Sequence, residues 1–289
     1  MKFLIGVVTV FACTLSAYIL QGGHLAVLAK AAPLELVIII GVTIGGFIIA
    51  NPGIVISRTL SSLKLLLKGP RYTQKSYIEL LSMLYRFFKI AKTKGMLALE
   101  SHIENPHESN VFGEFPGVLK EHHAIEFFCD YARLVTLGSE RPYEIEALMD
   151  EELEVHHFQD QAVVTSLNNM ADGLPAIGIV AAVLGVIHTM GSIAEPPEVL
   201  GRLIGGALVG TFMGVLLSYG LFAPIANSVK QALEAEARYM QCIKVGFLAH
   251  LQGFAPAISV EYARKALLHD VRPSFNELEE ATQKLPSGV

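Results

Sequence analysis

The side chains best suited to chemistry in this chain, its histidines and cysteines, are not spaced to build a catalytic or metal site. Two pairs of adjacent histidines occur, at 122–123 and 156–157. Neighbours on a helix point to different faces, so neither pair chelates a metal by itself. The cysteines Cys13, Cys129 and Cys242 contain no CxxC pair, which argues against a zinc site or a disulfide framework. The sequence also lacks a GxxxxGKS/T phosphate loop and a GxSxG elbow. We therefore expect no enzyme activity, no metal and no cofactor.

A second group of interest is a set of segregated charges. Residues 73–95 show a helical apolar stripe, and the polar side of that helix is basic. Its basic residues are Arg86, Lys89, Lys92 and Lys94, and the acids Glu100 and Glu104 follow. Such a surface is either a solvated face or a docking surface for an oppositely charged partner, and the sequence leaves both readings open.

The apolar segments lack an acid where a proton or sodium carrier is expected. Ion relays need an ionisable group within the membrane. Glu35 is expected at the start of its span, at an interface, and Asp172 lies just before another span. If this protein conducts an ion, the carboxylate must therefore come from another chain.

Four apolar segments must position these residues. They cover residues 3–20, 34–56, 172–192 and 202–226, each long enough to cross a membrane as a helix. The first could be a cleavable leader, because residues 14–17 (TLSA) resemble a small-residue cleavage site. Its apolar run continues to Leu20, however, and a second one follows closely. The chain has 289 residues, of which 52% are hydrophobic and only 17% charged. We predict an all-α polytopic membrane protein with four transmembrane helices and a helical cytoplasmic domain.

The last two spans carry small residues and prolines. Gly206, Gly210 and Gly214 are four residues apart, so another helix can approach closely, either from the same chain or from a partner. Pro224 should kink its helix. Pro175 is expected in the first turn of its helix, where proline is tolerated.

The basic residues set the expected topology and domains. A dense positive flank follows the second span, whereas the turns at 21–33 and 191–202 hold only Lys30 and Arg202. The positive-inside rule then places both termini in the cytoplasm. The expected divisions are spans at 1–57, a cytoplasmic helical domain at 58–171, spans at 172–226, and cytoplasmic helices and tail at 227–289. The net charge of −5 gives no indication of a nucleic-acid partner.

Nearly the whole chain resembles the motility protein A family of the MotA/TolQ/ExbB proton channel superfamily. The most specific segment is 209–224, VGTFMGVLLSYGLFAP. Segment 172–182, DGLPAIGIVAA, is nearly as specific, as are GMLALE at 95–100, IENP at 103–106 and EIEALMDEE at 144–152. The family's layout of four spans with a large second cytoplasmic segment also agrees.

The resemblance implies a role in the flagellar motor. Five A subunits would surround two copies of motility protein B, which supplies the membrane Asp. Ion flow would rotate the A ring, and its cytoplasmic charges would push the rotor protein FliG. Glu100 matches the rotor-facing acid, and Lys92 falls where many members have Arg, so charge is retained without bidentate pairing.

The resemblance also assigns positions in the membrane. Pro175 and Pro224 match the prolines that couple ion passage to movement, and Thr211 and Tyr219 match channel-lining positions. Sodium-driven relatives tend to have Thr at the position of Ala182, so its absence favours protons. The implied location is the bacterial inner membrane. The alternative is an ExbB/TolQ-type energy transducer of the cell envelope, whose members have three spans.

Overall fold

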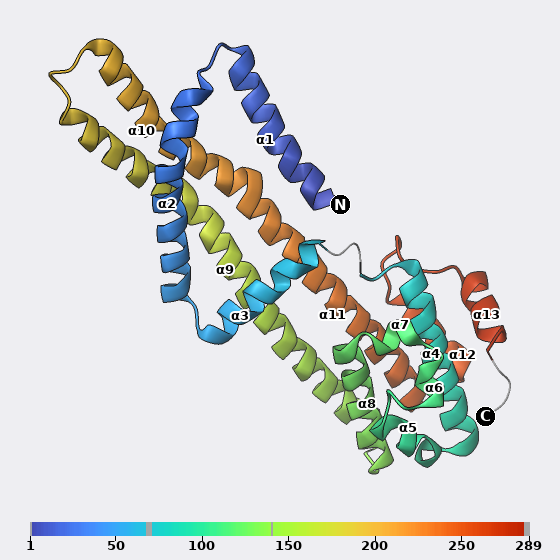
Figure 1. Ribbon diagram of the computed structural model, residues 1–289. Coiled ribbons are helices and arrows are strands. Elements are labelled where there is room, and N and C mark those ends of the chain that lie inside the picture. The colour runs from blue at the N-terminus through green and yellow to red at the C-terminus, as the bar shows by residue number, and fades with distance from the viewer. Residues whose placement is uncertain (1, 68–70, 140, 286–289) are drawn as a thin grey trace. The chain divides into compact units, whose positions relative to one another are not determined.

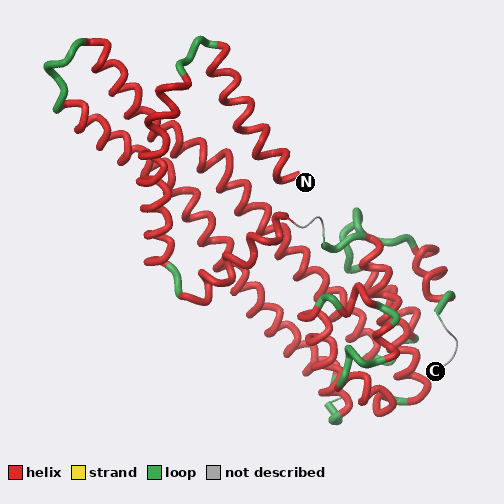
Figure 2. Tube along the Cα trace, in the orientation of Figure 1, coloured by secondary structure: helices red, strands yellow, loops and turns green. Residues whose placement is uncertain are grey.

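The structure is a computed structural model that describes residues 2–67, 71–139 and 141–285, and every regular element in these ranges is a helix. Figures 1 and 2 show helices joined by short loops, and the described residues contain no strand. The chain divides into two compact units. Unit 1 is Met1–Gly69 with Gln159–Gln231, and unit 2 is Pro70–Phe158 with Ala232–Val289. The predicted all-α class is confirmed.

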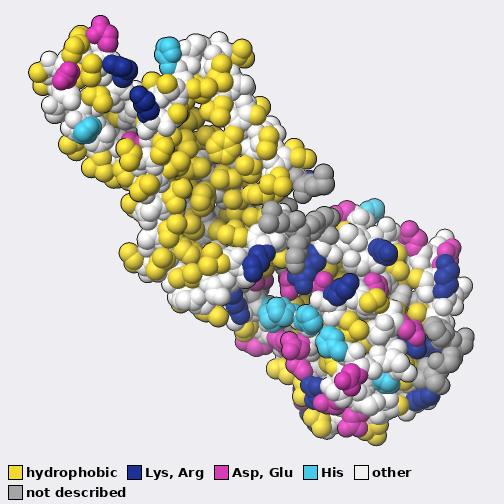
Figure 3. All heavy atoms as spheres, in the orientation of Figure 1, with side chains coloured by type: hydrophobic (Ala, Val, Ile, Leu, Met, Phe, Trp, Pro, Cys, Tyr) yellow, Lys and Arg dark blue, Asp and Glu magenta, His cyan; other side chains and the backbone are white. Residues whose placement is uncertain are grey.

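Unit 1 contains the apolar helices. They are α1 (Lys2–Leu20), α2 (Leu25–Ala50), the C-terminal part of α9 (Pro142–Met190) and α10 (Pro197–Leu217). Four helices of the described chain are long and apolar enough to cross a membrane, with mean hydropathy between 1.8 and 2.3 over their best windows. Hydrophobic side chains cover the face of this unit in Figure 3, as expected for a surface in contact with lipid tails.

The second apolar helix differs from the predicted segment 34–56. α2 begins at Leu25 and ends at Ala50, and Pro52 then starts α3 (Gly53–Ser62). The predicted turn at 21–33 is therefore wrong, since only residues 21–24 separate α1 from α2. Pro33 lies inside α2. A proline removes one backbone hydrogen bond, and the apolar sequence around it still favours a helix in lipid.

A single helix, α9, joins the predicted acidic helix to the third apolar segment. It runs for 49 residues and contains Pro175. Pro175 thus lies deep inside the helix, so the expectation that it occupies the first turn is wrong. The fourth segment is less regular, because a π-helical stretch, Ser218–Phe222, separates α10 from α11 (Ala223–Leu251).

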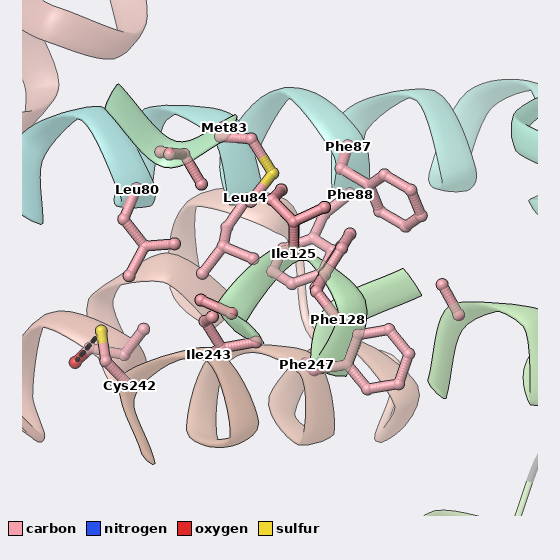
Figure 4. Close-up of a cluster of buried hydrophobic side chains, with 14 of the residues drawn as sticks. Leu80, Met83, Leu84, Phe87, Phe88, Ile125, Phe128, Cys242, Ile243 and Phe247 are labelled. Carbon is pink, nitrogen blue, oxygen red and sulfur yellow. Dashed lines mark hydrogen bonds between the residues drawn. The ribbon is translucent and has the colours of Figure 1, made fainter. Parts of the chain in front are cut away.

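Unit 2 is built around a hydrophobic core between α4 (Gln74–Lys94), α8 (His122–Thr136) and the C-terminal part of α11. Aromatic rings fill its centre (Figure 4), and the Phe87 and Phe128 rings meet edge to face at 4.7 Å. Short helices cover the core, namely α5 (Glu100–Glu104), α6 (Asn110–Gly113), α7 (Pro116–Leu119), α12 (Pro256–Lys265) and α13 (Phe275–Gln283).

Candidate functional site: a glycine-packed helix pair and a charged surface

Glycines bring α9 and α10 into backbone contact. A Cβ built on Gly214 would lie 2.7 Å from the Leu174 carbonyl oxygen and 2.8 Å from Gly178 Cα. A Cβ on Gly210 would lie 3.1 Å from the Ala182 nitrogen. Gly206 faces α2 instead, and a Cβ built on it would lie 3.6 Å from Ala31 Cβ. These contacts lie within one chain, so Gly210 and Gly214 are occupied by packing between its own helices.

Both prolines interrupt the hydrogen bonding of long helices. Pro175 lies one residue after the buried Leu174, whose carbonyl contacts Gly214. The π-helical stretch ends at Phe222, the following Ala223 N–H donates to the Ser218 carbonyl, and Pro224 is the next residue. Proline has no N–H to continue the ladder, and π-helical turns occur frequently at functional sites. The fourth apolar segment therefore has a built-in irregularity at Ser218–Pro224.

The residues expected along an ion path lie in different surroundings. Ala182 is buried beside Gly210, Thr211 is partly buried, and Tyr219 is 66% exposed in the π-helical stretch. The exposed Tyr219 ring is available to another chain. Of these three residues, Ala182 borders the packed Gly210 across the helix pair.

The position of Glu35 differs from the prediction, which placed this acid at the start of the second segment. Because α2 begins at Leu25, Glu35 falls in the third turn, and its side chain is 8% exposed. Its carboxyl lies against Gly210 of α10 and Gly185 of α9. The late predicted start placed Glu35 at the start of its helix and not within it, so the sequence pattern did not predict this contact.

The predicted basic face of α4 is only partly correct. Lys89, Lys92 and Lys94 are exposed, but Arg86 is buried and pairs with Glu114. Burial lowers the pKa of Arg86. The Lys92 ammonium donates a 3.2 Å hydrogen bond to the Gly253 carbonyl, which holds this cation at the surface.

Glu100 begins α5 and is exposed. The same short helix ends at Glu104, which accepts a 2.6 Å hydrogen bond from Arg133 of α8. This bond is the largest cause of the raised pKa of Arg133. Arg133 thus ties the segment that carries Glu100 to the core helix α8. No pattern in the sequence predicts a pair between residues so far apart along the chain.

The described residues contain no group of three or more His, Cys, Asp or Glu side chains that could hold a metal. His123 lies 3.2 Å from Glu236, and His156 lies 3.8 Å from Glu152. Each of these two histidines therefore lies beside a single carboxylate, as in an ion pair and not in a metal chelate.

Two family models match the chain over complementary parts. The MotA/TolQ/ExbB proton channel family matches residues 121–242, and the motility protein A N-terminal model matches residues 4–95. The first match includes α10, the C-terminal part of α9 and Pro224. The glycine-packed helices thus lie in a region typical of proton channels, a class of membrane protein and not of enzyme.

Comparison over the full length is more specific. The chain is 45% identical to motility protein A of Escherichia coli K12 over 280 residues, covering 97% of this chain and 94% of the relative. It is 33% identical to chemotaxis protein LafT of Vibrio parahaemolyticus, with 96% of each chain covered. The chain belongs to the motility protein A family.

Solved structures share the fold. The flagellar MotAB stator complex of Bacillus subtilis matches with a TM-score of 0.71 and 26% identity, over 96% of this chain and 98% of that one. The MotAB structure from C. jejuni matches with a TM-score of 0.76 and 21% identity, over 93% and 96%.

Proposed function

We propose that this chain is the A subunit of a flagellar stator and forms, with motility protein B, a proton channel that drives rotation of the rotor. The observation that carries the proposal is the similarity to motility protein A over 97% of the chain. Four candidate membrane helices also agree with this role better than with the three spans of an ExbB/TolQ-type transducer.

The proposed assembly contains five copies of this chain around two copies of motility protein B, which contributes the membrane Asp. The relatives solved as MotAB complexes support a B partner. The exposed surface of α1, which has no buried residue, is available for contacts with lipid or other chains. The proposed location is the bacterial inner membrane, with both termini in the cytoplasm, since four spans return the chain to the side carrying the positive flank.

The proposed ion path runs beside Ala182, Thr211 and Tyr219. Ala182 offers no side-chain oxygen, which favours protons over sodium, because sodium needs oxygen ligands to replace its water. A unit charge that crosses 100 mV releases about 2.3 kcal/mol. That energy would be coupled to movement at Pro175 and Pro224, where the helices lack backbone hydrogen bonds.

The proposed rotor contact consists of Lys92 and Glu100, both exposed in unit 2. They would act on complementary charges of the rotor protein FliG. Attraction between exposed charges steers encounter and orientation more than it adds affinity.

The test replaces each proline in a strain that lacks its own A subunit and is complemented by this chain. We expect Pro175→Ala and Pro224→Ala to assemble with motility protein B, as shown by co-purification, but to lose swimming. Pro33→Ala is the matched control, because Pro33 also lies inside an apolar helix but outside the packed pair, and it should swim normally. Normal swimming of both test variants, or failure of the unmodified chain to complement, would refute the proposal.

A further inference from the structure

Glu35 is a buried acid that the proposed ion path does not use. A Cβ built on Gly210 would lie 2.7 Å from Glu35 Oε2, a contact that real Cβ atoms do not make, so an alanine at this position would require the carboxyl to move. On its other side, a Cβ on Gly185 would lie 3.6 Å from Oε1. The side chain is 8% exposed, and Oε2 is buried without a hydrogen-bond partner.

Alanines border the two glycine positions that this carboxyl approaches. Ala181 and Ala182 of α9 border the Gly210 position, and Ala207 of α10 borders Gly185. An ionised carboxylate in such surroundings is strongly disfavoured, whereas a protonated one carries no net charge.

The charged and titratable groups on the three helices around Glu35 do not neutralise it. In the apolar part of unit 1 they are Lys30 on α2, Asp172 and His188 on α9, and Glu198 and Arg202 on α10, and all five are exposed. The Arg202 Nε donates to the backbone carbonyl of Glu198. Within the part of the chain that the structure describes, no cation pairs with the buried Glu35 Oε2.

We propose that Glu35 is a proton-binding site of this chain. The carboxylic acid keeps its proton while α2 is seated on α9 and α10. When α2 separates and water reaches Oε2, the O–H bond breaks, the proton passes to water and a carboxylate remains. Proton occupancy and the docking of α2 are thereby linked. This inference does not depend on the stator role, because protonation is measured without motility.

The test is infrared spectroscopy of the complete assembly in lipid at neutral pH. We expect a carboxylic acid C=O band in the difference between unmodified protein and Glu35→Gln. The matched control is Glu195→Gln, which removes an exposed acid from the turn between α9 and α10 and should remove no such band. Absence of the band at neutral pH in the Glu35 difference would overturn the proposal.

Gly210→Ala tests the buried position of the carboxyl against Gly210 while leaving Glu35 itself unchanged. The added methyl group would overlap Oε2, so we expect the acid band to shift or disappear. An unchanged band in Gly210→Ala would overturn the assignment of the acid band to a Glu35 carboxyl that lies against Gly210.

A second measurement needs no variant. A hydrophobic carbodiimide reacts with a protonated carboxyl: the acid oxygen bonds to the central carbon, and the acid proton moves to a carbodiimide nitrogen. Mass spectrometry should find the adduct on Glu35 and not on Glu195, with labelling that falls several-fold as the pH is raised. No adduct on Glu35, or equal labelling of both glutamates, would overturn the proposal.

Discussion

At the scale of single residues, exposed charges and buried titratable groups have separate roles in unit 2. Lys89, Lys92 and Lys94 remain on the surface of α4, while Arg86 turns inward to Glu114. The helical stripe predicted a basic side for α4, but the stripe alone could not show that Arg86 faces an acid in the next segment. A buried cation becomes tolerable when a carboxylate is brought to it.

Reversing the charge at Lys92 or Glu100 should weaken torque. An exposed charge pair contributes about 0.2–1 kcal/mol, so we expect Lys92→Glu or Glu100→Lys to reduce torque without abolishing it, and the opposite reversal on the rotor to restore part of it. Torque is measured on tethered cells. Glu279→Lys, an exposed charge on α13, is the control. Full torque in both test variants would mean that these charges only form a solvated face.

His250 should make the stability of unit 2 depend on pH. Its ring stacks on Phe88 at 4.5 Å, its Nδ1 is buried without a partner, and it lies outside the predicted spans. Burial, and secondarily Lys92, lowers its pKa from 6.5 to about 4. As the pH is lowered, His250 therefore takes up its proton in the unfolded chain before it does so in the folded chain. The contribution of neutral His250 to the free energy of unfolding is complete above pH 6.5 and is lost as the pH falls towards 4.

The expected loss between pH 7 and pH 5 is about 1 kcal/mol, once solvent screening of this partly exposed ring is allowed for. As the pH is lowered from 7 to 5, the melting temperature should fall less steeply for His250→Phe than for the unmodified protein. The phenylalanine keeps the ring stacking. His157→Phe, at an exposed histidine, should follow the unmodified protein. Equal slopes in all three proteins would contradict the assignment.

At the scale of helices, the packing of α9 on α10 requires glycine at a few positions only. Gly178, Gly210 and Gly214 meet backbone atoms of the facing helix, whereas Gly201 at the start of α10 has nothing within 4 Å. The spacing of the glycines predicted a close helix contact, and the structure decides that the contact is made within the chain for Gly210 and Gly214.

Gly214→Ala should separate α9 from α10. The added Cβ would meet the Leu174 carbonyl oxygen and Gly178 Cα, and backbone atoms cannot rotate away. Overpacking of this kind costs about 1–3 kcal/mol. We expect a lower melting temperature and a lower yield of assembled complex in detergent. Gly201→Ala should be neutral or slightly stabilising, because alanine favours helix. Equal behaviour of the two variants would refute the contact.

At the scale of the whole molecule, two acids are relevant to proton transfer: the Asp that motility protein B is proposed to supply, and Glu35 of this chain. They differ in role. The first would carry protons along the path, whereas Glu35 holds a proton between helices of one subunit. The proposed role would give unit 1 a buried proton-binding acid of its own, whereas the sequence pattern predicted that the carboxylate of an ion path comes from another chain.

A partner that lacks its membrane carboxylate separates these roles. Assemblies containing such a partner should conduct no protons in liposomes with an imposed membrane potential, because the path then has no carrier. Persistent flux that is lost on adding Glu35→Gln would assign the conduction to Glu35. The unmodified assembly is the positive control, and both assemblies must contain equal amounts of this chain.

The sequence by itself determined the apolar segments, the all-helical class and the family. These follow from local composition, because a long uncharged segment in lipid must satisfy its own backbone hydrogen bonds and therefore forms a helix. The exposed positions of Lys92 and Glu100 were also predictable, since long charged side chains remain hydrated unless an opposite charge is buried with them.

Only the tertiary structure decided which faces meet. Four features join residues from different segments of the chain. They are the burial of Arg86 beside Glu114, the contact of Glu35 with Gly210 and Gly185, the pairing of Arg133 with Glu104, and the packing of Gly210 and Gly214 against α9. The start of α2 at Leu25 places Glu35 within that helix and not at its end. Periodicity gives the faces of one helix, but contacts between helices depend on how their backbones pack in three dimensions.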